Sequence, residues 1–238
     1  MLQWWVNQAT MTIRQGLNTT LILFLLLFYP GRLLAQESDF QSWWEFEFDR
    51  SVGKSWQLKG ELEQRFKNNS LQYNRTLLTL GAEFEAYKWL SLGGAGRVVM
   101  VGDGEGQVHP RYRIHFDATG SYDLSGFTFS LRTRLQYGFE DLQIFSQLRE
   151  NNLVSRNRLK VRYHFFGTKF RCFAALESWH NLSELPDPAF KHMRYQAGLS
   201  YDLSFRSRFS LRYIFEDEFN VRSPDKLHIL VAGFAHSF

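Results

Sequence analysis

Charged side chains recur at every second position in this chain of 238 residues. The clearest case lies in the segment 153–165, where alternate positions carry Arg156, Arg158, Lys160, Arg162 and His164. A period of two is the period of a β-strand, so these basic groups would share one face. A helix would scatter them and bury some without partners, which is costly. A row of fixed charges that lines an enclosed interior can select charged solutes, and this is the chemistry that the sequence offers most clearly.

The sign of the charged face changes along the chain, from mainly acidic in the early segments to mainly basic in the middle ones. The candidate interior charges are Glu45, Glu47, Glu61, Glu63, Arg113, Arg132, Arg134, Arg156, Arg158, Lys160 and Arg162. In a closed barrel the two groups would lie roughly opposite each other. They could interlock as ion pairs and fill the interior, as side chains fill barrels of about eight strands. Alternatively, they could line a narrow, water-filled pore.

Two groupings could support nucleophilic catalysis, which needs a Ser or Asp activated by His. Ser178 and His180 are two residues apart and would share a face, and His115 lies near Asp117 and Ser121. A Ser-x-His pair is common by chance, and no third group is implied. The sequence therefore predicts no catalytic residue.

Metal and cofactor sites are not indicated either. His192, His228 and His236 lack metal-ligand spacing, and Gly102–Gly106 resembles a calcium loop only loosely, so it is best interpreted as a polar loop. Cys172 is the single cysteine and is most simply a small apolar residue. We expect no metal and no cofactor.

The composition is rich in aromatic residues, at 17%, with 23 Phe and 7 Trp. The formal net charge is +4, and residues 1–35 contribute Arg14 and Arg32 without any acidic residue. The remaining chain holds 26 basic and 24 acidic residues, which does not argue for nucleic acid as a partner.

The N-terminus carries the pattern of an export signal. Arg14 precedes the apolar run Leu21–Tyr29, and Ala35 supplies a small residue for cleavage. The alternative is a membrane anchor, although the run is short for a spanning helix. We predict a signal peptide over 1–35, cleaved near Ala35, with translation starting at Met1 or Met11.

The mature chain, 36–238, divides into eleven alternating segments and forms one domain. We predict strands at 43–50, 56–67, 73–86, 89–101, 111–124, 127–137, 153–165, 170–180, 193–203, 209–219 and 227–238. Most of the connections alternate between tight turns and longer polar loops, and aromatic residues gather near both ends of the strands. These features are typical of an outer-membrane barrel with short periplasmic turns and longer extracellular loops.

The expected fold is therefore all-β, a closed antiparallel transmembrane β-barrel of 10–12 strands. A soluble barrel would turn the apolar face inward, but it gives no reason for the two aromatic girdles. Antiparallel closure requires an even number of strands. Either 43–50 is an extra strand beside a ten-stranded barrel, or an undetected strand raises the count to twelve.

Several motifs carry a resemblance to a known family. Trp43–Glu47, Leu62–Phe66, Arg149–Leu153, Arg156–Leu159 and Asp217–Asn220 are similar to the DUF2490 family of bacterial outer-membrane β-barrel proteins. The resemblance covers nearly all of the mature chain. It implies location and fold, and it brings no catalytic residues.

The expected fold implies both a cellular location and molecular partners. We expect the bacterial outer membrane, contact with its lipid, and recognition by the barrel-assembly machinery through the C-terminal strand ending at Phe238. For function we favour a structural barrel with an ion-paired, charge-lined lumen and no enzyme activity. The alternatives are a narrow porin-like channel for small polar or charged solutes and, less favoured, a hydrolase acting on lipid. The oligomeric state stays open.

Overall fold

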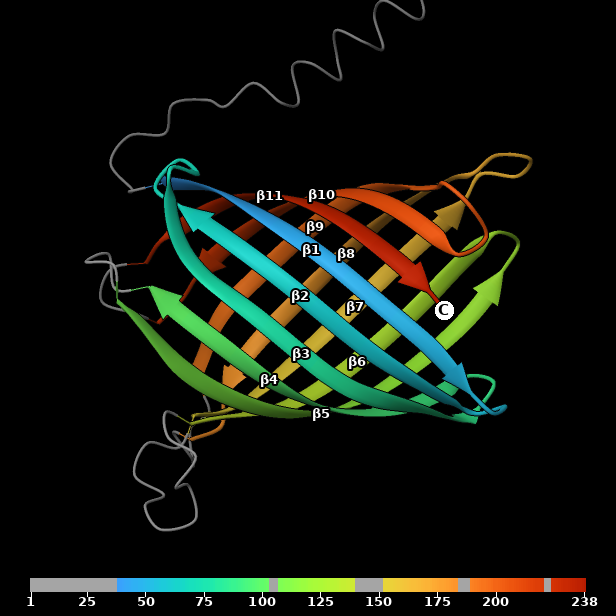
Figure 1. Cartoon of the computed structure of the whole chain (residues 1–238), viewed down its shortest axis with the longest axis horizontal. Helices are drawn as coiled ribbons and strands as arrows, with labels where there is room; N and C mark the ends of the chain where they lie inside the picture. Colours follow the sequence, from blue (N-terminus) through green and yellow to red (C-terminus); the bar gives the residue numbers. More distant parts are fainter. Residues whose placement is uncertain (1–37, 103–106, 140–151, 184–188, 221–223) are drawn as a thin grey trace, which may run out of the picture. The chain divides into compact units, whose positions relative to one another are not determined.

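The computed structural model describes residues 38–102, 107–139, 152–183, 189–220 and 224–238, which form the compact unit Glu37–Phe238. The predicted signal peptide lies outside the described residues. Eleven strands form one closed barrel (Figure 1). They are β1 (Ser38–Val52), β2 (Trp56–Lys67), β3 (Gln72–Tyr87), β4 (Leu90–Gly102), β5 (Val108–Leu124), β6 (Phe127–Phe139), β7 (Asn152–His164), β8 (Phe170–Asn181), β9 (Ala189–Asp202), β10 (Ser207–Glu218) and β11 (Lys226–Ser237). Within these residues, no helix is long and apolar enough to cross a membrane.

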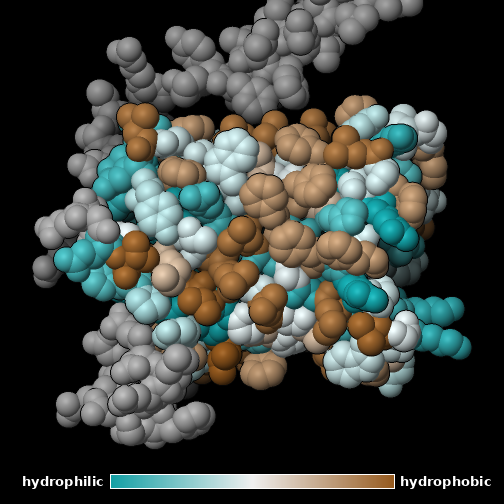
Figure 2. Space-filling model, in the orientation of Figure 1, coloured by the Kyte–Doolittle hydropathy of each residue, from teal (hydrophilic) through white to brown (hydrophobic). Residues whose placement is uncertain are grey.

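The predicted alternation of faces is confirmed. On β6, Leu131 points outward and is 57% exposed, whereas the neighbouring Arg132 and Arg134 line the interior. Large apolar side chains cover the middle of the visible outer surface, and hydrophilic residues gather toward its two ends (Figure 2). An exposed apolar belt of this extent is suited to hydrocarbon, and a closed sheet leaves no strand edge without partners there.

The barrel closes through a parallel pair. β1 runs beside β11 from Ser38 opposite Lys226 to Asp49 opposite Ser237, whereas every other neighbouring pair is antiparallel (Figure 1). The prediction of a wholly antiparallel barrel is therefore wrong at this seam. Neither explanation offered for the odd count applies, because 43–50 belongs to a strand of the barrel and the described barrel is complete with eleven. A parallel closure removes the requirement for an even number.

An apolar cluster lies on the inner side of this seam. Trp43 of β1, Ile214 of β10, and Ile229 and Val231 of β11 pack together and are at most 4% exposed. Burying such side chains contributes about 1.5–3 kcal/mol each relative to leaving them exposed. The cluster therefore stabilises the one pairing that joins the two ends of the sheet.

Tight turns join the strands at one end of the barrel. Ser125 and Gly126 connect β5 to β6 with φ values of 45° and 85°, which is the left-handed geometry of a two-residue hairpin. The connections at the other end have four to twelve residues, against two to five at this end, and the shortest of them, 68–71, separates β2 from β3. In that turn the backbone N–H groups of Asn68 and Asn69 donate to the Asp39 carboxylate at 3.2 and 3.0 Å.

Aromatic side chains pack against one another near the tight turns, as predicted for a girdle. Trp56 lies 5.0 Å from Phe84, and Tyr87 stacks on Trp89 at 5.7 Å between ring centroids. On β8 and β9, the ring centroids of Phe170 and Tyr201 lie 4.8 Å apart. Aromatic side chains gathered in this way are suited to the boundary between the hydrocarbon of a membrane and water.

Candidate functional site

All eleven charged residues predicted for the interior line one cavity of about 600 Å³. They come from β1, β2, β5, β6 and β7 and are Glu45, Glu47, Glu61, Glu63, Arg113, Arg132, Arg134, Arg156, Arg158, Lys160 and Arg162. Small residues on β3 and β4, among them Gly81, Gly93 and Ala95, face the same space. Their lack of bulk leaves the volume open on that side.

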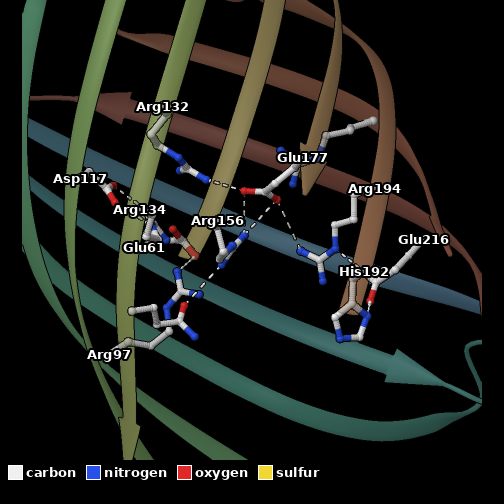
Figure 3. Close-up of polar contacts among 12 residues, drawn as sticks. Glu61, Arg97, Asp117, Arg132, Arg134, Arg156, Glu177, His192, Arg194 and Glu216 are labelled. Carbon is white, nitrogen blue, oxygen red and sulfur yellow. Dashed lines mark hydrogen bonds and ion pairs between the residues drawn. The ribbon is translucent and has the colours of Figure 1, made fainter. Parts of the chain in front are cut away.

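A layer of ion pairs crosses the interior (Figure 3). Its central acid is Glu177 of β8, which is 2% exposed. The Glu177 carboxylate accepts hydrogen bonds from Arg132 at 2.7 Å and from Arg156 at 3.1 Å, and it lies 4.0 Å from Arg194. One carboxylate thus faces three guanidinium groups from three strands, and this fixes all four side chains.

Two further pairs extend the layer toward β2. Arg134 donates to both oxygens of Asp117 at 2.7 Å, a bidentate arrangement. Arg97 donates to Glu61 at 2.9 Å and to the Thr79 hydroxyl at 2.7 Å. Because Arg97 and Arg134 are both under 10% exposed, an unpaired charge in either position would be costly.

The side of the layer near the seam combines ion pairs with aromatic rings. Arg194 pairs with Glu216, and its guanidinium carbon lies 4.5 Å from the Trp179 ring centroid. Arg65 pairs with Glu63 and lies 3.6 Å above Trp43. Cation–π contacts to desolvated rings contribute about 2 kcal/mol, so these tryptophans hold the arginines in place. Trp43 was not predicted as an interior residue.

A second cavity of about 230 Å³ lies toward the longer connections. Arg113 and Trp179 line both cavities, so these two side chains belong to the partition between the two spaces. One basic and one aromatic side chain thus separate the two cavities of the described interior.

Part of the basic row on β7 lies outside this network. Among the described residues, no ion pair involves Arg158, Lys160 or Arg162, although Lys160 lies 4.2 Å from the Phe173 ring centroid. These three side chains give one wall of the larger cavity a positive charge, whereas Glu47 lines the same space from β1.

The observed ion pairs differ from the predicted ones, in which the acidic residues of the early strands faced the basic residues of the middle strands. Glu45 pairs with Arg212, Glu61 with Arg97 and Glu63 with Arg65, all outside the predicted basic set. The partners that sequence reasoning missed are Arg65, Arg97, Asp117, Glu177, Arg194, Arg212 and Glu216. Their alternation within the strands indicated that they face the interior, but it did not indicate which acidic residue pairs with which basic one.

The two catalytic groupings are not assembled for acid–base work. Ser178 and His180 follow the outward phase of β8, and the His180 ring packs 5.3 Å from Phe190. Asp117 is committed to Arg134, so it does not orient His115. Ser121 is six residues from His115 along β5, or roughly 20 Å at the usual rise of a strand.

The remaining candidates are scattered. His236 contacts the Ser207 hydroxyl at 3.0 Å near the tight turns, and His228 contacts the Tyr213 hydroxyl at 2.6 Å. His192, in contrast, lies beside Glu216 and Glu218, a grouping that sequence spacing did not indicate. Of the loosely calcium-like loop, 103–106 lies outside the described residues.

The apolar exterior, closed sheet and charged interior define a transmembrane β-barrel. The chain belongs to the DUF2490 family, described as proteins of unknown function, whose model matches residues 40–225. Among solved structures it is similar to a NanC porin in a rhombohedral crystal form, with 13% identity and a TM-score of 0.50. That match covers 80% of this chain and 93% of the porin chain, and it supports the fold. No curated protein matches the chain.

Proposed function

We propose that the protein is a structural barrel of the bacterial outer membrane whose lumen is closed by ion pairs, without enzyme activity. The observation that carries this proposal is the burial of Glu177 among Arg132, Arg156 and Arg194. Buried charged side chains that are linked to one another in this way fill space that a conducting pore would leave to water.

The location is part of the same proposal. Export would depend on the signal peptide over 1–35, cleaved near Ala35, and the apolar belt would then contact membrane lipid. Phe238 is 68% exposed and lies in the outward phase of the last strand, where the barrel-assembly machinery would recognise it. Its N–H donates to the Asp49 carbonyl at 2.9 Å, so the chain end is fixed against β1.

A narrow channel for small charged solutes is the second candidate. The similarity to a porin fold favours it, and so does the basic wall formed by Arg158, Lys160 and Arg162. The partition at Arg113 and Trp179 would then be the constriction, and it would have to open for solutes to pass.

Conductance in a planar bilayer separates the two candidates. We expect the refolded mature protein to be silent even at many copies per membrane. The double variant Arg156→Ala/Trp179→Ala removes the tryptophan of the partition and the arginine of the ion-pair layer that lies 4.0 Å from its ring centroid, and it should conduct. The control Trp89→Ala changes an exposed outer tryptophan and should stay silent. Discrete current steps from the unchanged protein would rule out the closed lumen and favour the channel.

A further inference from the structure

Three possible metal ligands meet on the inner wall of the barrel. His192 of β9 lies directly opposite Glu218 of β10 in the strand register, and Glu216 precedes Glu218 by two residues, so both carboxylates share the inward face. One ligand atom from each residue lies within 4.8 Å of the other two. His192 lines the smaller cavity of about 230 Å³. Figure 3 shows the His192 ring beside Glu216.

The distances within this group do not fit ordinary hydrogen bonds. The buried Nδ1 atom of His192 lies 3.4 Å from Glu216 Oε1 and 3.5 Å from Glu218 Oε1. A good N–H···O bond measures about 2.7–3.2 Å, and Nδ1 has no hydrogen-bond partner among the described residues. One ring nitrogen therefore faces two carboxylate oxygens at nearly equal distances, which lie within ion-pair range but beyond the length of a good hydrogen bond.

The same distances fit ligands that share one ion. Zinc binds imidazole nitrogen and carboxylate oxygen at about 2.0–2.2 Å in tetrahedral geometry. The edge of a tetrahedron is about 1.6 times the bond from its centre to a corner, which gives a separation of roughly 3.4 Å between ligand atoms. The two distances at Nδ1 equal this edge within about 0.1 Å.

Outer partners hold the ligands in place. The second oxygen of Glu216 pairs with Arg194, and the second oxygen of Glu218 accepts the Asp225 N–H at 3.2 Å. The His192 ring lies edge-on to Trp179 with 5.4 Å between centroids. Each ligand is thus oriented by a group outside the set, as is usual around protein-bound metals.

We propose that His192, Glu216 and Glu218 form a binding site for a divalent, zinc-like ion on the wall of the smaller cavity. The two carboxylates supply two negative charges at the ligand atoms against the one guanidinium in contact with them, whereas Arg111, Arg113 and Lys191 line other parts of the cavity. Three ligands including a nitrogen suit Zn²⁺ rather than Ca²⁺, which takes six to eight oxygens. The fourth position would face the cavity and could hold water or a solute. This proposal goes beyond the closed lumen and does not depend on conductance.

Equilibrium dialysis of the untagged, refolded barrel against Zn²⁺ tests the site. We expect one Zn²⁺ retained per chain, and a tetrahedral absorption spectrum when Co²⁺ replaces it. Glu218→Gln keeps the shape but removes a ligand charge. It should weaken Zn²⁺ binding at least about 10-fold, because even changes to the groups that hold the ligands of a metal cost about 10- to 100-fold in affinity. His192→Ala should abolish retention.

The matched control is His228→Ala, which removes a histidine from outside the group and should bind Zn²⁺ as the unchanged protein does. Heat-dependent gel mobility verifies that each variant is folded. If the folded unchanged protein retains no Zn²⁺, or if Glu218→Gln and His192→Ala retain as much as the control, the proposed site is wrong. The His192 ring would then be held between the two carboxylates without a metal ion.

Discussion

Replacing Glu177 by Gln probes the ion-pair layer at its centre. The change keeps the volume of the side chain but removes the negative charge shared by Arg132, Arg156 and Arg194. Three guanidinium groups from β6, β7 and β9 would then face one another around a neutral amide. Arg156 and Arg194 are each 8% exposed, so water cannot replace the lost charge without opening the layer.

The expected loss of stability is large. Removing one partner of a buried ion pair costs about 3–5 kcal/mol, because an uncompensated charge stays buried. Urea titration of the refolded barrel in detergent, followed by tryptophan fluorescence, measures the free energy of unfolding. Trp43 and Trp179 lie within the affected layer and report on it directly.

Glu83→Gln is the matched control, because Glu83 pairs with Lys59 at 2.8 Å in a more open setting, with side chains 31% and 46% exposed. Exposed pairs contribute about 0–1 kcal/mol, so this variant should unfold nearly as the unchanged protein does. If Glu177→Gln lowers the unfolding free energy no more than Glu83→Gln, the interior is solvated and the reasoning from burial fails.

Three further predictions concern the seam, the basic wall and the outer face. The variants for the seam all carry Cys172→Ala, which removes the native thiol. Ser42→Cys and Leu230→Cys lie opposite each other across β1 and β11, so they should cross-link under a lipid-soluble oxidant. Ser42→Cys and Phe234→Cys should not cross-link, because Phe234 lies four residues, or about 13 Å, farther along β11. Cross-linking only in the second pair would refute the register. In the conducting variant Arg156→Ala/Trp179→Ala, reversal potentials should show anion preference, and Lys160→Glu should reduce it; cation preference before that change would contradict the positive wall. Purified protein and its Ser178→Ala variant should both leave phospholipid intact in mixed micelles, and turnover that Ser178→Ala removes would establish the hydrolase.

The sequence was sufficient to place side chains inside or outside the barrel. On β7, Arg156 and Arg158 alternate with Asn157 and Leu159, and a period of two leaves only two assignments for the whole strand. The aromatic girdles then favoured apolar side chains outward, and Leu159 is indeed 49% exposed. Local alternation therefore determines the faces of a strand without information about its neighbours.

Ion partners could not be predicted in the same way, because they depend on the stagger between strands. Arg97 reaches Glu61 across β3, and Arg212 reaches Glu45 across β11, although 167 residues separate the latter two along the chain. Nothing in the local pattern of β2 distinguishes Arg97 from Arg113 as the partner of Glu61. The same holds for His192, whose ligand-like neighbours come from another strand.

The parallel closure also lay beyond sequence reasoning. Both β1 and β11 alternate regularly, and a strand with this pattern can pair in either direction. The apolar cluster of Trp43, Ile214, Ile229 and Val231 gives the physical reason in the folded chain, since these inward residues need one another to be buried. In the sequence these four residues lie in three separate segments, and nothing in those segments indicates a shared seam.

Thiol labelling at two inward positions tests most directly whether the ion-pair layer closes the lumen. Both positions line the larger cavity, and both are tested in a Cys172→Ala background. Thr79→Cys lies within the layer beside Arg97, where Thr79 is 7% exposed, whereas Ser121→Cys replaces a half-buried residue outside the layer. A charged thiosulfonate applied to the refolded barrel should modify Ser121→Cys rapidly and leave Thr79→Cys intact until urea unfolds the protein. Equal rates at the two positions in the folded barrel would mean that water fills the interior through the layer.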